Sequence, residues 1–318
     1  PPLDYTTVAP FLQAEYSIGL FTVRGGVRYE DAHLDVATYR TLAFYGNRSV
    51  EGGRLSFQEP VYNLGGVVQL GAGFSAFAAY TEGFGLPDVG LILRAVNQPN
   101  RSVTRLLELV PVLTENKEAG ITWRGERGSA TLSVYESESD FSSVVRIDNT
   151  GIGKVDRVPT RVRGAELAAD WRVLDKLTLN AAAALLDGKT AVAAGQPIDL
   201  DLGARNIGPD KAVLGATYRF TPALSVRLQS TTLFDRDINI GRNTPTTRFE
   251  EHFDGYTLFD AAVTWRTSIG TFGLGIENLQ NRQYYGYYAQ ADVNAALSND
   301  SYFAGRGRTV SVRYTIEF

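Results

Sequence analysis

The sequence ends with Val310-Ser311-Val312-Arg313-Tyr314-Thr315-Ile316-Glu317-Phe318, in which apolar and polar side chains alternate strictly up to the terminal aromatic residue. Successive side chains of a β-strand point to opposite faces, so this stretch predicts a strand with one apolar and one polar face. In a soluble β-sandwich the apolar face would belong to the core. In a transmembrane β-barrel it would face lipid, the polar face would line a water-filled interior, and the strand would end at the bilayer edge.

The same alternation recurs earlier in the chain, over residues 21–30, 212–220, 224–229 and 259–266. The polar positions of these segments include ionised side chains at mid-strand, such as Arg227. A dry protein core rarely tolerates unpaired charges. The recurrence therefore favours an all-β, transmembrane antiparallel barrel.

The composition agrees with this fold class and excludes several others. Of 318 residues, 44% are hydrophobic and 21% charged, and no window approaches the ~18 consecutive apolar residues of a transmembrane helix. The 32 glycines, 16 tyrosines and 16 phenylalanines fit many turns and aromatic girdles. The net charge of −4, without a basic tract, argues against a nucleic-acid partner. The absence of cysteine excludes thiolate metal sites, disulfides and cysteine nucleophiles.

The start of the chain carries no export signal. The sequence has no methionine, begins with Pro1-Pro2-Leu3-Asp4, and lacks the charged and apolar regions of a signal peptide. We therefore interpret it as a mature product or a fragment.

The alternating segments and turn residues predict about thirteen strands. We expect them at residues 11–18, 21–33, 61–70, 74–84, 115–124, 129–140, 161–173, 176–187, 211–220, 224–235, 256–266, 271–285 and 308–318.

The connections between these strands alternate between short and long. The short ones are residues 19–20, 71–73, 125–128, 174–175, 221–223 and 268–270, and the long ones are 34–60, 85–114, 141–160, 188–210, 236–255 and 286–307. This is typical of bacterial outer-membrane barrels, whose short turns are periplasmic. Phe318 would then end in the periplasm while Pro1 would start outside the cell. Complete single-chain barrels have even strand numbers, so the odd count predicts the C-terminal part of a larger barrel, broken within an extracellular loop.

Six motifs follow one another along the chain. They are Gly25-Gly26-Val27-Arg28-Tyr29, Ala79-Tyr80-Thr81-Glu82-Gly83-Phe84-Gly85-Leu86-Pro87-Asp88, Glu115-Asn116-Lys117-Glu118-Ala119-Gly120, Arg163-Gly164-Ala165-Glu166-Leu167, Gly275-Ile276-Glu277-Asn278-Leu279-Gln280-Asn281-Arg282-Gln283-Tyr284-Tyr285, and Gly305-Arg306-Gly307-Arg308-Thr309 before the terminal Phe318. In this order the series resembles the C-terminal barrel portion of TonB-dependent outer-membrane receptors, especially those for ferric siderophores. The second and last motifs are most similar to receptors for hydroxamate and mixed-carboxylate siderophores of the aerobactin kind.

The resemblance has several implications. Residues 1–318 would form the C-terminal part of a 22-stranded barrel, with about nine strands, the N-terminal plug domain and the energy-coupling box absent from these residues. The whole receptor would be a bacterial outer-membrane transporter, not an enzyme. It would import ferric siderophores as ligands, without a covalent cofactor. Its partners would be outer-membrane lipid and lipopolysaccharide, and the TonB complex, which would act through the plug.

Aromatic residues gather beside the last long connection, at Tyr284, Tyr285, Tyr287 and Tyr288. Tyrosine rings can stack on and hydrogen-bond a metal chelate at the barrel mouth. They are also enriched where a barrel meets lipid headgroups. We expect either ligand contact or girdle packing.

Arginines occur in two of the long connections. Arg94, Arg101 and Arg105 lie in one, and Arg236, Arg242 and Arg248 lie in the other. Guanidinium groups suit the carboxylates of an anionic ferric chelate. Solvated or lipopolysaccharide-facing side chains are the alternative. From these residues, we take Arg94, Arg101, Arg105 and Arg242 as candidate ligand contacts beside the four tyrosines.

Other ionisable residues support no catalytic or metal site. The two histidines, His33 and His252, have no second ligand at a fixed spacing. The lumen carboxylates, which are Glu30, Glu118, Glu166, Asp170 and Asp260, are expected to pair with lumen arginines such as Arg28, Arg124 and Arg266. An outer-membrane enzyme would need a nucleophile or paired acids with a histidine at the rim, and neither histidine lies in a recognisable setting of that kind. A passive channel or porin stays the main alternative, and a structural or adhesive fragment a less specific one. The residues do not distinguish one siderophore from another.

Overall fold

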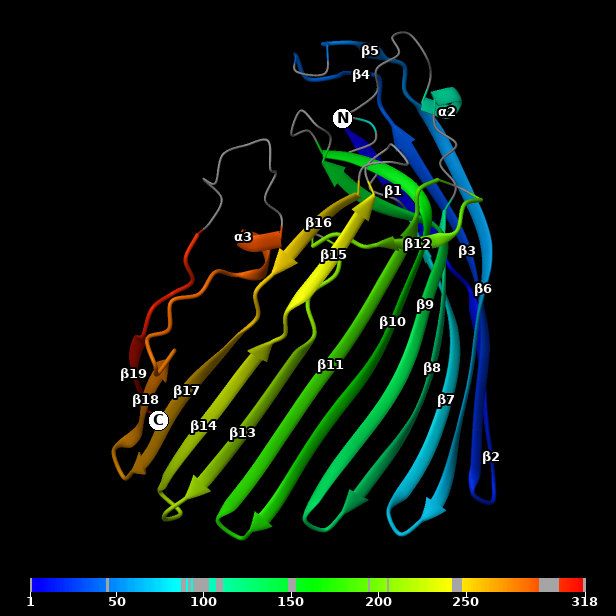
Figure 1. Cartoon of the computed structure of the whole chain (residues 1–318). Helices are drawn as coiled ribbons and strands as arrows, with labels where there is room; N and C mark the ends of the chain where they lie inside the picture. Colours follow the sequence, from blue (N-terminus) through cyan, green and yellow to red (C-terminus); the bar gives the residue numbers. More distant parts are fainter. Residues whose placement is uncertain are drawn as a thin grey trace.

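The computed structural model describes residues 2–43, 46–86, 90, 93, 103–106, 111–147, 153–193, 195–204, 206–241, 248–291 and 303–316. One 15-stranded sheet follows the order of the chain, with antiparallel neighbours (Figure 1). Its strands are β1 (Leu3–Val8), β2 (Phe11–Ile18), β3 (Phe21–Val36), β6 (Gly53–Gly71), β7 (Phe74–Gly85), β8 (Val112–Gly125), β9 (Gly128–Ile147), β10 (Gly153–Leu174), β11 (Leu177–Ala191), β12 (Ile198–Asp201), β13 (Lys211–Arg219), β14 (Leu224–Leu233), β17 (Tyr256–Thr267), β18 (Gly270–Glu277) and β19 (Thr309–Thr315).

Smaller elements stand apart from this sheet. They are the hairpin of β4 (Tyr39–Arg40) and β5 (Ser49–Val50), the hairpin of β15 (Arg236–Gly241) and β16 (Arg248–Phe253), and the helices α2 (Val103–Leu106) and α3 (Tyr287–Ala291). None of the helices in the described residues is long and apolar enough to cross a membrane.

The strand count agrees with the sequence. β1 and β2 both pair with β3, and Val8↔Asp31 and Phe11↔Arg28 belong to one continuous register, so the two segments act as one strand. β12 is a short addition to β11. With these two adjustments the 15 assigned strands become the expected thirteen. The prediction of an antiparallel transmembrane β-barrel segment is confirmed.

The strand ends differ from the prediction in several places. β3 reaches Val36 and β6 already begins at Gly53, so much of the expected loop 34–60 is paired strand. β9 reaches Ile147 and β10 begins at Gly153, so most of the expected loop 141–160 is a long hairpin. The expected strand 271–285 instead stops at Glu277, because Asn278 and Asn281 adopt left-handed φ angles of 50° and 52°. Asn278 stabilises this turn by donating to the carbonyl oxygen of Arg282 at 2.8 Å and accepting from its amide at 2.8 Å.

The tight turns lie together at one end of the sheet, and the hairpins and helices at the other (Figure 1). Gly73 shows why one such turn needs glycine. Gly73 has a φ angle of +82°, and Gly71 in the same turn has one of +86°. A Cβ at Gly73 would also meet the carbonyl oxygen of Arg124 at 2.1 Å. The alternation of short and long connections predicted this separation of the two ends.

The two faces of the sheet have opposite character. The lipid face, defined by apolar side chains that stay exposed, includes Val23, Trp171, Leu214, Trp265 and Val312. Cross-strand pairs such as Trp171↔Leu179 keep apolar residues together on this face. The opposite, lumen face carries polar residues at the alternate positions.

The character of the faces changes toward the extracellular end. In β3 the apolar Phe21, Val23 and Val27 lie on the lipid face, but further along Ala32, Leu34 and Val36 are buried on the lumen face. The switch needs no bulge, because β3 keeps an unbroken register with β6 from Phe21 to Val36. The part of the strand with apolar residues on the lipid face is called the lipid band. Beyond it, toward the extracellular end, β3 therefore buries its apolar residues on the lumen side.

Three apolar clusters follow from this inward burial, and the long connections supply much of them. The first joins Leu34 and Phe57 to Leu93 and Val103, the second contains Ile238, Phe253 and Tyr287, and the third contains Val158, Leu202 and Ile207. Gly188 permits the third, because a Cβ there would meet Ile207 Cδ1 at 2.6 Å and Leu202 Cδ1 at 2.9 Å. The connections thus fold over the lumen side of the mouth.

Candidate functional site

The tyrosines beside α3 divide into packed and exposed groups. Tyr287 is buried and meets the ring of Phe253 edge-on, with centroids 5.0 Å apart. Tyr284 packs against Tyr256 in a tilted arrangement, with ring centroids 4.6 Å apart, and lies against Gly305, where a Cβ would meet the Tyr284 ring at 2.2 Å. Tyr284 and Tyr287 therefore hold the loop in place.

The other two predicted tyrosines are more accessible. Tyr288 is 63% exposed on the surface of α3. Tyr285 is partly buried, forms an isolated bridge with Ala304, and its carbonyl oxygen accepts from Gln290 Nε2 at 2.9 Å. Among the four, Tyr288 is the side chain most available to a ligand at the mouth.

Of the four arginines predicted as ligand contacts, only Arg105 belongs to the described residues. Arg94, Arg101 and Arg242 lie outside them. Arg105 belongs to α2, beside the buried Val103. Its backbone is therefore anchored at the edge of the first cluster.

Two contacts anchor the connection that carries these arginines. The Tyr39 hydroxyl donates to the carbonyl oxygen of Leu93 at 2.5 Å, and the Val103 amide donates to the carbonyl oxygen of Glu51 at 3.0 Å. Burial raises the pKa of Tyr39 to about 12. The β4–β5 hairpin and the α2 connection thus form one packed unit.

Arg236 has a structural role. Its Nη1 donates to the carbonyl oxygen of Gly208 at 2.7 Å and to that of Leu186 at 3.3 Å. Asp210 Oδ1 accepts the Leu186 amide at 2.7 Å. These contacts connect the β15–β16 hairpin to the connection between β12 and β13. Arg248, the other arginine of this hairpin, lies in β16.

His252 is held by two carboxylates on the β15–β16 hairpin. Its Nδ1 lies 2.5 Å from Asp237 Oδ1 and its Nε2 lies 3.1 Å from Asp254 Oδ1. The hydrogen bonds to Asp237 and then to Asp254 raise the pKa of His252 above its usual value of 6.5. His33 contacts Ser56 Oγ at 3.0 Å. Across the described residues, no group of three or more potential ligands could hold a metal ion.

The lumen wall carries both signs of charge, but their pairing differs from the prediction. Arg28 Nε donates to Glu30 at 2.7 Å, as expected. Arg124 and Arg266 form no ion pair within the described part of the chain, so the prediction of carboxylate partners is wrong for them. Each lies close to a tight turn, whereas Glu118 and Asp260 lie higher on the same strands.

A sequence signal marks these arginines. All three tryptophans of the chain, Trp123, Trp171 and Trp265, are followed directly by arginine, and Tyr218 is followed by Arg219. In a strand, such a pair places the aromatic ring on the lipid face and the arginine on the lumen face at the same height. Interfacial aromatic residues mark the bilayer edge. The arginines therefore lie at the periplasmic rim of the lumen.

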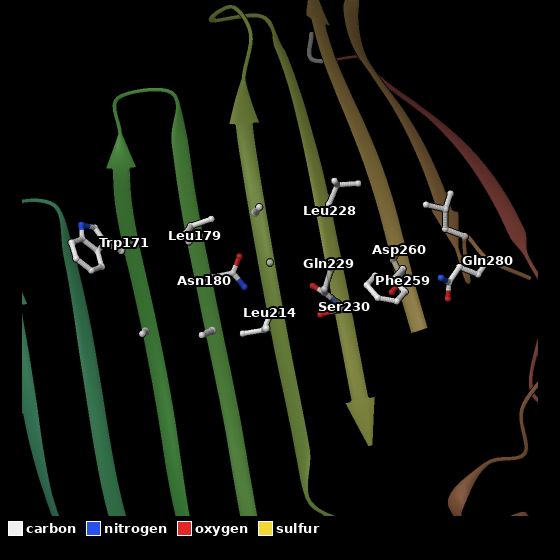
Figure 2. A pocket seen from close by; sticks show the side chains of 15 residues that line it. Trp171, Leu179, Asn180, Leu214, Leu228, Gln229, Ser230, Phe259, Asp260 and Gln280 are labelled. Carbon is white, nitrogen blue, oxygen red and sulfur yellow. The ribbon is translucent and has the colours of Figure 1, made fainter. Parts of the chain in front are cut away.

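An apolar hollow of about 770 Å³ spans five neighbouring strands (Figure 2). Its lining includes Trp171, Leu179, Leu214, Leu228 and Phe259, which share the lipid face, and Asn180, Gln229 and Asp260, which share the opposite face. Apolar surface of this kind accommodates acyl chains better than an anionic chelate. The hollow is therefore not a candidate site for ferric chelates.

A family model described as "TonB dependent receptor-like, beta-barrel" matches residues 1–279. The ferric aerobactin receptor of Klebsiella pneumoniae is 28% identical over 349 residues, an alignment that covers 100% of this chain and 45% of that protein. The rhizobactin receptor of Rhizobium meliloti is 26% identical over 349 residues, covering 100% of this chain and 44% of that protein. The chain thus spans less than half the length of these relatives.

Solved structures show the same fold. The copper transporter OprC superposes with a TM-score of 0.77 at 18% identity, covering 96% of this chain and 47% of that one. At this identity the likeness concerns the fold alone.

Proposed function

The chain belongs to the TonB-dependent receptor-like β-barrel family of the bacterial outer membrane, and from this premise we propose that the whole receptor imports ferric siderophores. Support comes from relatives described as ferric aerobactin and rhizobactin receptors. Residues 1–318 would supply barrel wall and part of the extracellular mouth. Import would depend on the TonB complex.

The proposed domain arrangement makes residues 1–318 the C-terminal part of the barrel. The sheet has two outer edges, one at β1 and β2 and one at β19, and no pairing in the described residues joins them. Exposed strand edges are usually paired or covered. The remaining strands would pair with these edges, and an N-terminal plug would fill the lumen and receive the action of TonB.

One observation carries the choice of transporter over passive channel. The long connections pack apolar clusters on the lumen side of the extracellular end, where an open channel needs a wide, polar passage. The packed loops restrict the mouth and present Tyr288 at its surface. We propose that Tyr285, Tyr288, Arg94, Arg101, Arg105 and Arg242 contribute ligand contacts, and that Tyr284 and Tyr287 position them.

Direct binding by the full-length receptor tests the function. Ferric aerobactin-type and other ferric siderophores would be compared with the iron-free chelators and with cobalamin, by fluorescence quenching. Selective binding of a ferric chelate is expected. Failure to bind any ferric chelate, together with steady conductance in planar bilayers, would support the passive channel instead.

A further inference from the structure

The short helix α3 presents Tyr288 at the extracellular mouth, and it cannot hold this position by itself. It has five residues. Isolated helices shorter than about 12–15 residues are marginal in water. The placement of α3 must therefore come from its contacts with neighbouring segments, of which the β15–β16 hairpin lies beside it (Figure 1).

Gln290 makes the polar part of this contact. Its Oε1 accepts from the amide of Asp254 at 3.0 Å, and its Nε2 donates to the carbonyl oxygen of the same residue at 3.1 Å. Asp254 directly follows β16. The side-chain amide thus pairs with both backbone polar groups of one residue, as a residue of a neighbouring antiparallel strand does. We call this pair of hydrogen bonds the Gln290 clamp.

Gln290 also bonds within its own connection. Its Nε2 donates to the carbonyl oxygen of Tyr285 at 2.9 Å, and its backbone amide donates to that of Gly286 at 3.2 Å. Both donor positions of the side-chain amide and one acceptor position are thereby used. Gln290 therefore ties the segment before α3 to the end of β16.

Tyr287 supplies the apolar part of the contact. Its ring meets that of Phe253, the residue before Asp254, with centroids 5.0 Å apart. Residues three apart lie on the same face of a helix, so Tyr287 and Gln290 both face the end of β16. Tyr288 is turned about 100° from Tyr287 around the helix axis, and it is 63% exposed. The two contacts together determine which way Tyr288 points.

The end of β16 is a firm anchor for the clamp. Phe253 is fully buried, and the amide of Gly255 donates to Asp235 Oδ1 at 2.6 Å. A Cβ at Gly255 would collide with the carbonyl oxygen of Leu233, so this corner packs directly against the end of β14. Through Asp254, α3 is attached to a strand of the barrel wall.

The clamp is not needed to satisfy the backbone of Asp254. The Asp254 side chain is 84% exposed, so water reaches this corner and can pair with the same amide and carbonyl groups. Water cannot hold α3 at a fixed distance and rotation. Loss of the clamp should therefore cost little stability, but Tyr288 would then have to be ordered when a ligand binds, which weakens binding.

We propose that Gln290 is a positioning residue for ligand recognition, which fixes α3 through its clamp on Asp254 and so orders Tyr288 before a ferric chelate binds. The inference rests on the proposed function and adds a residue that acts through Tyr288 rather than by touching the chelate. It also makes the β15–β16 hairpin and the α3 connection one recognition unit.

Fluorine NMR of the full-length receptor, with 3-fluorotyrosine in place of Tyr288, tests the positioning without a siderophore. The otherwise unchanged receptor should give one narrow resonance, and Gln290→Ala should broaden or shift it. Gln283→Ala is the matched control, because Gln283 is exposed in the same connection and its side chain forms no hydrogen bond within the described part of the chain. An unaltered resonance in Gln290→Ala would overturn the positioning.

Binding of ferric aerobactin, measured by fluorescence quenching, tests the consequence. Gln290→Ala should weaken binding roughly tenfold, the factor that corresponds to one or two net hydrogen bonds, and should leave the unfolding transition in place. In the Tyr288→Ala background the same change should have a much smaller effect, because the side chain that the clamp orders is gone. Gln283→Ala should bind like the wild type.

The outcomes separate this role from the proposed function. If the wild type binds no ferric chelate, the proposed function is wrong and the role in recognition falls with it, while the fluorine spectra still decide whether Gln290 orders Tyr288. If the wild type binds and Gln290→Ala binds equally well, the positioning role is wrong and the proposed function stands. Loss of affinity by the same factor with and without Tyr288 would also overturn the role.

Discussion

Leu34 and Asp35, neighbours in β3, point to opposite faces where the character of the strand changes. Leu34 is 1% exposed within the lumen-side cluster, while Asp35 accepts from Arg54 Nε at 2.7 Å on the outside. That hydrogen bond holds the pKa of Asp35 below its usual value. In the lipid band of the same strand, the apolar residue would be the outward one.

Leu34→Ala should therefore destabilise the receptor by about 2–5 kcal/mol, because it leaves a cavity in a closed cluster. A urea titration of the refolded receptor measures this. Asp35→Asn, which loses only an exposed ion pair, should have a much smaller effect. Equal effects would contradict the burial of this cluster.

Leu228 and Gln229 in β14 test the assignment of faces. Leu228→Arg should cost about 2–4 kcal/mol, because the charge would face the bilayer interior. Gln229→Arg, on the lumen face of the same strand, should be mild. Refolding titrations into lipid vesicles compare them, and the reverse order would invert lipid and lumen faces.

Gly188 tests the inward fold of the β11–β13 connection. Gly188→Val should displace Leu202 and Ile207, which a Cβ would meet at 2.9 and 2.6 Å, and expose the segment 198–210. Faster cleavage there by protease added to intact cells is the expected result. Gly208→Ala is the control, since a Cβ at Gly208 meets nothing within 4 Å. Unchanged cleavage in Gly188→Val would mean that the connection does not pack on β11.

Tyr287 and Tyr288 should separate folding from binding. Tyr287→Ala removes a buried ring and should destabilise the receptor by about 3 kcal/mol. Tyr288→Ala should leave the unfolding transition in place and weaken ferric-chelate binding several-fold, which fluorescence titration measures. Unaltered affinity in Tyr288→Ala would remove this residue from the proposed site.

The β15–β16 hairpin should be sensitive to pH through His252. Its pKa is raised in the folded state, so its contribution to stability is complete below the unfolded value of 6.5 and is lost as pH rises through the folded pKa. Amide exchange in the hairpin, measured by mass spectrometry and corrected for intrinsic rates, should lose protection over that window.

His252→Gln should abolish this pH dependence, because glutamine cannot carry the positive charge that pairs with the carboxylates of Asp237 and Asp254. His33→Gln, on the distant β3, should keep it. The same pH profile in both variants would assign the dependence to another group.

The strands of the lipid band were predictable from the sequence by itself. Alternation with period two, as in Val310 to Thr315, specifies a strand and both of its faces, because the pleat leaves each side chain only one side. The tight turns were equally local, since glycines such as Gly73 permit backbone angles that other residues disfavour. Short and long connections then set the two ends of the barrel.

The arrangement above the lipid band was decided only by tertiary structure. Alternation identifies an apolar face but does not say what covers it, so the inward burial of Leu34 requires Leu93 and Val103 from a distant connection. The tyrosines separate for the same reason, because Tyr287 packs against Phe253 of β16 and Tyr288 does not. Likewise the charge of Arg124 was visible in the sequence, whereas its lack of a carboxylate partner in the described part of the chain depends on which strands and turns lie beside it.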